Sequence, residues 1–122
     1  MILELDSKYP ITLRFIDNTF FNNYDMLYGV IRTQTGIIMN DKGSTYYNNV
    51  GNLGSAYYFS INYDNFTIIV EHSITGIKAY NNYAKYGGVM YIVEASKNLL
   101  VSIISCTFNN NQASKKGGTM FI

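Results

Sequence analysis

Apolar and polar residues alternate in several short runs along the chain, and each run ends close to an asparagine or a glycine. In the first run, Ile11, Leu13 and Phe15 fall on one face and are separated by polar or charged neighbours. This period of two residues is typical of a β-strand with one buried face. Comparable runs begin at Ile37, Val70 and Leu99. The pattern predicts an all-β chain of short strands joined by turns.

Four asparagines mark an internal repeat when the chain is aligned on them. These asparagines are Asn23, Asn49, Asn82 and Asn111. The residues three positions earlier are Phe20, Tyr46, Ala79 and Phe108. The glycines eight or nine positions after that aromatic column are Gly29, Gly54, Gly87 and Gly117, and the last two begin the pairs Gly87-Gly88 and Gly117-Gly118. The asparagines are 26, 33 and 29 residues apart, so the repeat varies in length.

Unequal spacing favours stacked β-coils over a helical solenoid, because extra residues can bulge out of a β-coil at a turn. Each strand would pair in parallel with its counterpart one coil away, about 4.8 Å along the axis. We therefore predict a single-stranded parallel β-solenoid of about four coils, formed by one domain over residues 1–122. The coils are expected at about residues 9–34, 35–65, 66–96 and 97–122, with residues 1–8 ending a preceding coil. Further strands are expected after the glycine column, at residues 56–61, 89–93 and 119–122.

Each column of the repeat would have a physical role in this fold. The aromatic column would stack inside the solenoid. The asparagine column would lie at a bend, where amides of successive coils can hydrogen-bond as a ladder. The glycine column would turn the chain where φ is positive, or where close packing leaves no room for a side chain.

Two motifs in the repeat carry a family resemblance. Residues 20–23 and 108–111 match the pattern FxxN, and the pairs Gly87-Gly88 and Gly117-Gly118 resemble a GGA[ILV]-type motif. In this order, they resemble the repeats of chlamydial polymorphic outer membrane proteins over roughly residues 9–122. The resemblance implies a right-handed parallel β-helix in a secreted or surface-displayed protein that adheres to a glycan or protein of a host or matrix. It supplies no catalytic residues.

Composition narrows the range of functions. The chain has 122 residues, of which 48% are hydrophobic and 14% charged, and its net charge of +1 offers no electrostatic basis for binding nucleic acid. The first residues lack the basic and apolar segments of a signal peptide, and no apolar run approaches the length of a membrane-spanning helix. Cys106 is the only cysteine, which excludes an intrachain disulfide and a zinc site made of cysteines. No cofactor is expected.

The two ends of the chain can be aligned with each other. Residues 1–8 align with residues 90–97, which would place Met1 in the column of Met90 and Met120. The chain would then open and close in mid-strand, at almost the same phase of the coil. Solenoids normally cap such open edges. We therefore expect a fragment of a longer protein, with further coils of the same polypeptide as partners at both ends.

Four residues are candidates for chemistry. His72 falls in an inward-facing column and has no second histidine as a co-ligand, so we interpret it as a core residue. Cys106 lacks an adjacent histidine to activate it, which indicates a small buried side chain. Asp17 and Asp41 are the nearest approach to the paired acids of calcium or acid–base sites. The Lys42-Gly43 turn offers a simpler explanation for Asp41.

Exposed aromatic residues could form a surface that stacks against glycans, or could simply reflect a chain with 12 Tyr. The residues concerned are Tyr24, Tyr28, Tyr47, Tyr83 and Tyr86. We interpret Lys115-Lys116 as a solvated turn. The glycosylation sequon at Asn65-Phe66-Thr67 is expected by chance, since the chain has 15 Asn.

Two functional hypotheses from different classes follow. The first is a non-enzymatic structural or adhesive segment of a larger surface or secreted protein. The second is part of a pectate-lyase-like carbohydrate enzyme whose catalytic coils lie outside these residues. Acidic or basic residues stacked in one outward column of the flanking coils would favour the enzyme, and further plain FxxN and Gly-Gly coils would favour the adhesin. A third possibility is a gene fragment that is never expressed.

Overall fold

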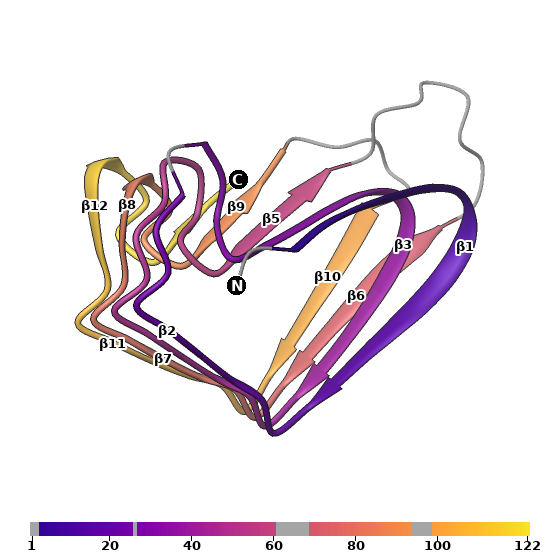
Figure 1. The fold of residues 1–122 in the computed structure, drawn as a ribbon, viewed down its shortest axis with the longest axis horizontal. Coiled ribbons are helices and arrows are strands. Elements are labelled where there is room, and N and C mark those ends of the chain that lie inside the picture. Colours follow the sequence, from indigo (N-terminus) through magenta and orange to yellow (C-terminus); the bar gives the residue numbers. More distant parts are fainter. Residues whose placement is uncertain (1–2, 26, 61–68, 94–98) are drawn as a thin grey trace.

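The chain folds into a parallel β-solenoid of about four turns, as its sequence predicts. The structure, a computed structural model, describes residues 3–25, 27–60, 69–93 and 99–122. Within these ranges there are thirteen strands and no helix, and the paired strands all run parallel. In Figure 1, successive coils lie behind one another and enclose a common interior.

Three sheets form the wall of the solenoid. The first sheet contains β1 (Leu3–Ile16), β3 (Ile31–Lys42), β5 (Tyr57–Ser60), β6 (Val70–Thr75), β9 (Met90–Ile92), β10 (Leu99–Ile104) and β13 (Met120–Phe121). The second sheet contains β2 (Thr19–Phe21), β4 (Thr45–Tyr47), β7 (Lys78–Tyr80) and β11 (Thr107–Asn109). The third sheet contains β8 (Tyr83–Tyr86) and β12 (Gln112–Lys116). The second sheet runs along the lower left of Figure 1.

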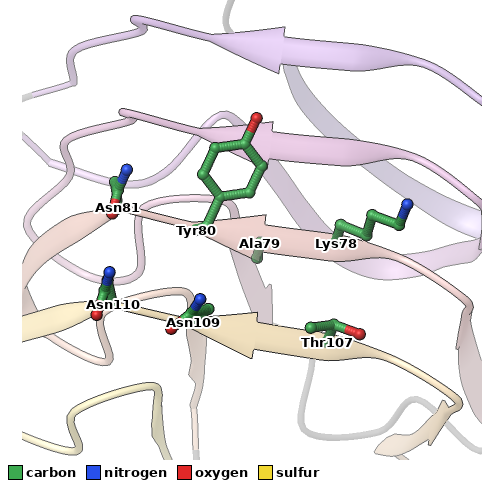
Figure 2. A pocket seen from close by; sticks show the side chains of 7 residues that line it. All are labelled: Lys78, Ala79, Tyr80, Asn81, Thr107, Asn109 and Asn110. Atoms are coloured by element: carbon green, nitrogen blue, oxygen red, sulfur yellow. The ribbon is translucent and has the colours of Figure 1, made fainter.

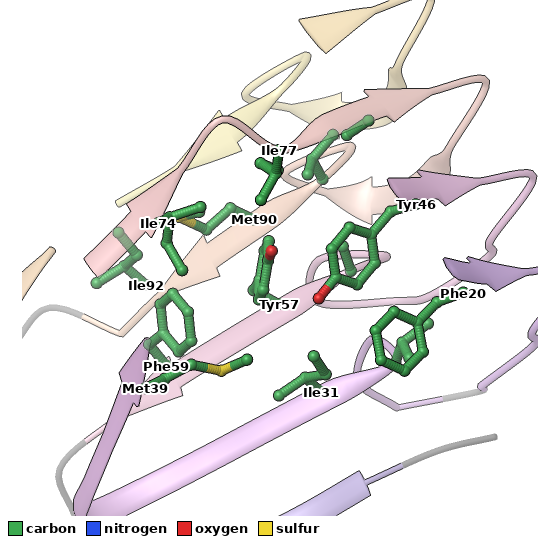
Figure 3. Packing of buried hydrophobic residues seen from close by; sticks show 14 of the residues in the cluster. Phe20, Ile31, Met39, Tyr46, Tyr57, Phe59, Ile74, Ile77, Met90 and Ile92 are labelled. Carbon is green, nitrogen blue, oxygen red and sulfur yellow. The ribbon is translucent and has the colours of Figure 1, made fainter. Parts of the chain in front are cut away.

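The strand register confirms the interior aromatic column. Phe20 pairs with Tyr46, Tyr46 with Ala79, and Ala79 with Phe108. The rings of Phe20 and Tyr46 stack inside the solenoid with 4.9 Å between their centroids (Figure 3). Aliphatic residues from the first sheet, such as Ile74, fill the remaining interior. The alternation in the sequence therefore identifies the inward side of interior strands such as β3 and β6, whereas Ile11 in β1, at the end of the stack, is exposed.

Residues with positive φ make the corners between the sheets. The corner between the first and second sheets is made by Asp17, Gly43, Gly76 and Ser105, with φ of 52°, 71°, 63° and 54°. The corner between the second and third sheets is made by Asn22, Asn48, Asn81 and Asn110, with φ of 53°, 54°, 55° and 52°. Asparagine adopts this left-handed conformation more readily than most residues. This preference explains why an asparagine precedes each asparagine of the repeat column.

The glycine column is confirmed for three coils. Gly54, Gly87 and Gly117 have φ of 71°, 61° and 69°, and strands β5, β9 and β13 follow them as predicted.

Gly29 does not belong to this column, contrary to the prediction. A Cβ atom on Gly29 would lie 2.8 Å from the carbonyl carbon of Ser55, and the next residue, Val30, donates its N–H to the Ser55 oxygen. Gly29 is therefore the counterpart of the second glycine, Gly88, where close packing leaves no room for a side chain. The nine-residue spacing of the fourth coil arises from a bulge after Ala113, and the first coil has no such bulge.

The additional residues of the longest repeat lie between β5 and β6. Gln34 pairs with Ser60, 26 residues further on, whereas Asn40 pairs with Ser73, 33 residues further on. Since β3 runs without interruption from one pairing to the other, the additional residues lie between its two partner strands. Insertion there leaves the register of the other sheets unchanged, as expected for a β-coil.

The predicted alignment of Met1 with Met90 is wrong by two residues. Met1 lies outside the described residues, but Leu3 pairs with Ile31, and the pairing continues through Tyr57 to Met90. A register shift in β1, between Ser7 and Ile11, separates the two ends of the strand. An alignment without gaps could not detect this irregularity.

Candidate functional site

The asparagine column forms a continuous amide ladder through the four coils. The Nδ2 atoms of Asn23, Asn49 and Asn82 donate to the Oδ1 atoms of Asn49, Asn82 and Asn111 at 3.0, 3.1 and 2.9 Å. Each accepting Oδ1 also receives the backbone N–H of the preceding rung. The Nδ2 of each rung after the first donates in addition to the carbonyl of the aromatic column one coil back. The predicted ladder is confirmed, and its polar groups are satisfied although Asn49 and Asn82 are buried.

Asp41 lies in the interior, and the explanation by a turn is wrong. It belongs to β3, two residues before the corner at Gly43, and its side chain is 1% exposed. Its Oδ2 accepts hydrogen bonds from the hydroxyls of Tyr46 and Tyr57, the latter at 2.7 Å. Burial, reinforced by the neighbouring carboxylate, raises the pKa of both phenols well above the usual value, so they remain donors.

The two acids do not form a site on the outer surface. Asp17 is exposed at a corner, whereas Asp41 faces inward and is held by tyrosines. Across the described residues, no group of three or more His, Cys, Asp or Glu side chains could hold a metal ion.

His72 is buried in the core, as its column predicts. The backbone N–H of Met39 donates to Nδ1 at 3.0 Å, which places the imidazole proton on Nε2, 3.4 Å from the Thr33 hydroxyl. The ring stacks on Phe59 with 4.2 Å between centroids. Burial lowers the pKa of His72 to about 4, so the imidazole is neutral at physiological pH. Both ring nitrogens therefore have polar partners within the core.

Other predicted residues are dispersed over the surface. The thiol of Cys106 is half-buried and contacts the carbonyl oxygens of Ile74 and Ile104 at 3.4 Å. Lys115 and Lys116 are exposed, but they belong to β12 at its bulge and do not form a turn. The sequon at Asn65 lies outside the described residues.

The five predicted surface tyrosines are exposed or half-buried, but they do not form one platform. Tyr28 packs against Tyr58, and Tyr86 against Phe121, next to the first sheet. Tyr83 begins strand β8 of the third sheet, and Tyr24 is its equivalent in the first coil. Each of them pairs in parallel with Val50. Tyr47 alone of the five projects from the second sheet.

An outward aromatic ladder covers the second sheet, and the sequence analysis missed most of it. Phe21, Tyr47 and Tyr80 occupy equivalent positions of β2, β4 and β7. Their rings are nearly parallel, with centroids 5.2 and 5.1 Å apart. The sequence does carry a signal for this ladder, because the position directly after the interior aromatic column is aromatic in three coils. We call these three residues the outer ladder.

Polar columns border the outer ladder on both sides. On one side are Thr19, Thr45, Lys78 and Thr107, and on the other are Asn22, Asn48, Asn81 and Asn110. Rigid strands and repeated corners fix all three columns at the spacing of the coils. The second sheet therefore presents a flat face that combines aromatic rings with amide, hydroxyl and ammonium groups.

The outer ladder ends in a hollow. Register places Asn109 next to Tyr80, so the fourth coil has no ring to continue the stack. A hollow of about 210 Å³ is present there, lined by Lys78, Ala79, Tyr80, Asn81, Thr107, Asn109 and Asn110. Figure 2 shows the Tyr80 ring leaning away from the strand that carries Thr107 and Asn109. One face of this ring is therefore open toward the hollow, and Tyr80 is 36% exposed.

A second outward stack lies on the first sheet. Tyr91 stacks between Tyr58 and Phe121, at 5.8 and 5.1 Å. At its other end, the guanidinium of Arg32 lies 3.9 Å from the centre of the Tyr28 ring and forms an ion pair with Glu4 at 3.6 Å. The charged pair therefore closes this stack at its Arg32 end, and Phe121 forms the other end.

No family model, curated protein or solved structure matches this chain. Among the described residues, no helix has the length and apolar character needed to cross a membrane.

Proposed function

We propose that this chain is a non-enzymatic adhesive segment of a larger surface or secreted protein and that it binds a glycan through the outer face of the second sheet. The observation that carries the proposal is the outer ladder with the open face of Tyr80 at its end. Tyrosine provides a rigid contact surface that loses little conformational entropy on binding.

The polar columns beside the outer ladder suit the chemistry of a sugar. A pyranose ring has an apolar face that packs on an aromatic ring and a rim of hydroxyls that need hydrogen-bond partners. Amides such as Asn81 and Asn110 can both donate and accept, and so can the Thr107 hydroxyl. Because the groups project from paired strands and fixed corners, the face is organised before a ligand arrives.

The repeat motifs support the location that we propose. Phe20 and Asn23 of the FxxN pattern, and Gly87 and Gly88 of the glycine pair, form the interior stack, the amide ladder and the turn of the solenoid. We infer on this basis that the chain is related to polymorphic-membrane-protein-type repeats and is displayed outside the cell.

The proposal is tested by glycan binding with two matched variants. Tyr80→Ala removes the open ring of the outer ladder, whereas Tyr91→Ala removes an outward ring from the stack on the first sheet. We expect the wild-type chain to bind immobilised polysaccharides, Tyr80→Ala to bind up to about tenfold more weakly, and Tyr91→Ala to bind like wild type. Absence of binding to a broad panel, or an equal loss in both variants, would contradict the proposal.

A further inference from the structure

The hollow next to Tyr80 has the position of a missing rung in the outer ladder. Phe21, Tyr47 and Tyr80 follow one another at the spacing of the coils, and Asn109 occupies the next position. The ring centroids of Tyr47 and Tyr80 are 5.1 Å apart, and their planes are inclined by 1°. A flat ring placed above Asn109 would continue the stack with this geometry. The site therefore selects a ring-shaped group.

The lining of the hollow selects the kind of ring. Apart from Tyr80 and Ala79, the residues that line it are polar or charged: Lys78, Asn81, Thr107, Asn109 and Asn110. An aromatic peptide side chain would leave most of these groups without partners. A sugar ring offers one apolar face to Tyr80 and a rim of hydroxyls to the surrounding amides and the threonine.

The charge of the residues around the hollow narrows the class of ligand further. Lys78 is the one charged residue that lines the hollow, and no carboxylate among the described residues forms an ion pair with it. The surrounding part of the chain is also basic, since residues 66–122 contain five lysines and two glutamates. An ammonium group without a protein carboxylate favours a ligand that brings its own negative charge.

We propose that this hollow binds a carboxylated sugar ring, such as a uronic acid residue within an acidic polysaccharide. The inference rests on the proposed function and adds its ligand class. Tyr80 stacks on the ring, Lys78 pairs with the carboxylate, and Thr107, Asn109 and Asn110 hydrogen-bond to the hydroxyls.

The first test compares an oligomer of galacturonic acid with the same oligomer after methyl esterification, which removes the charge and keeps the ring. We expect the acidic oligomer to bind the wild-type chain about threefold to fivefold more tightly at low salt, and the difference to shrink as salt screens the pair. Lys78→Gln should abolish the difference, whereas Lys85→Gln, on the third sheet, should retain it.

A second variant tests the position of the site. Asn109→Tyr places a ring in register with Tyr80, where it would stack and fill the hollow. We expect this variant to remain folded, as judged by thermal melting, and to lose binding of both oligomers by at least tenfold.

The outcomes separate the two proposals. Equal affinity for the acidic and esterified oligomers would overturn the acidic ligand class and leave glycan binding standing. Unchanged binding by Asn109→Tyr would overturn the hollow as the site. Failure of both oligomers and of every other polysaccharide to bind would overturn the proposed function itself.

Discussion

At the scale of single residues, the environment of His72 shows how a polar side chain becomes part of the core. Its Nδ1 accepts the Met39 N–H, and Phe59 covers the face of the ring. A second proton on the imidazole would have to sit on Nδ1, facing the Met39 N–H. Burial therefore favours the neutral ring, which explains a pKa lowered to about 4.

This environment predicts an acid-sensitive stability. In the unfolded chain His72 takes up its proton near pH 6.5, whereas in the folded chain it does so only near pH 4. Stability from the neutral histidine is thus complete above pH 6.5 and is lost as pH falls from 6.5 to 4, by about 3 kcal/mol in total. Urea unfolding of the wild-type chain at pH 7.0 and 4.5 should show most of this loss.

Other groups also titrate over this range, so a variant must isolate the contribution of His72. His72→Gln retains hydrogen-bonding capacity near Met39 but cannot titrate. We expect its unfolding free energy to fall by distinctly less than that of the wild-type chain between the two pH values. Equal decreases in both proteins would show that the burial of His72 does not set the acid sensitivity.

Asp41 shows why some residue-level features could not be predicted. The alternation correctly places it in an inward column, with Phe15 and Ile74 as its neighbours. Its residue type and the glycine two positions later favour a turn instead. The hydroxyl partners lie 5 and 16 residues further on, and only the register of the folded coil brings the second of them, Tyr57, to the carboxylate.

At the scale of strands and turns, the structure separates two reasons for glycine. Gly87 has φ of 61°, and an added Cβ would lie 2.1 Å from the Met90 carbonyl oxygen. Gly76 has φ of 63°, but a Cβ there would meet no atom within 4 Å. At Gly118 neither restriction applies. The three positions therefore isolate the cost of backbone conformation from that of close packing.

Alanine substitutions at these positions should give a graded series. Gly118→Ala is expected to leave stability nearly unchanged, and Gly76→Ala to cost about 1 kcal/mol for the left-handed conformation. Gly87→Ala should cost more than about 2 kcal/mol, because the backbone at Met90 must also move. Chemical unfolding would measure all three. A loss at Gly76 as large as that at Gly87 would show that backbone conformation alone sets the cost at Gly87.

The strands themselves were largely predictable, and their irregularities were not. Period-two alternation and the asparagine anchors identify the aromatic column, the amide ladder and the strands after Gly54, Gly87 and Gly117. The bulge after Ala113 and the register shift in β1 leave no local signal, because they depend on which strand lies beside them. The same holds for the outer ladder, since its rings become neighbours only once the coils stack.

At the scale of the whole molecule, three columns run parallel to the solenoid axis. The interior aromatic column, the amide ladder and the outer ladder each connect one coil to the next. In a solenoid each coil contacts only its neighbours, so stability is approximately a sum of interfaces between coils. The amide ladder is the polar column that crosses every such interface, and an interior rung serves two interfaces at once.

Removal of an interior rung should therefore destabilise the whole stack. In Asn49→Ala, the backbone N–H of Asn23 loses the Asn49 Oδ1, the Nδ2 of Asn23 keeps the Phe21 carbonyl but loses its contact to the next coil, and the carbonyl of Phe20 loses the Asn49 Nδ2. Because these groups lie in or next to a buried column, we expect a loss of about 3 kcal/mol in the free energy of unfolding. Urea unfolding should show a lower midpoint with an unchanged slope if the coils still unfold together.

Asn52→Ala provides the matched control for this rung. Asn52 lies three residues further along the same coil, and its backbone carbonyl accepts hydrogen bonds from Lys85 and Tyr86, which an alanine retains. We expect this substitution to change stability by less than about 1 kcal/mol. If the two variants were equally stable, the amide ladder would contribute little, and the aromatic columns alone would have to hold the coils in register. A reduced slope for Asn49→Ala alone would instead show that the rung couples the coils on its two sides.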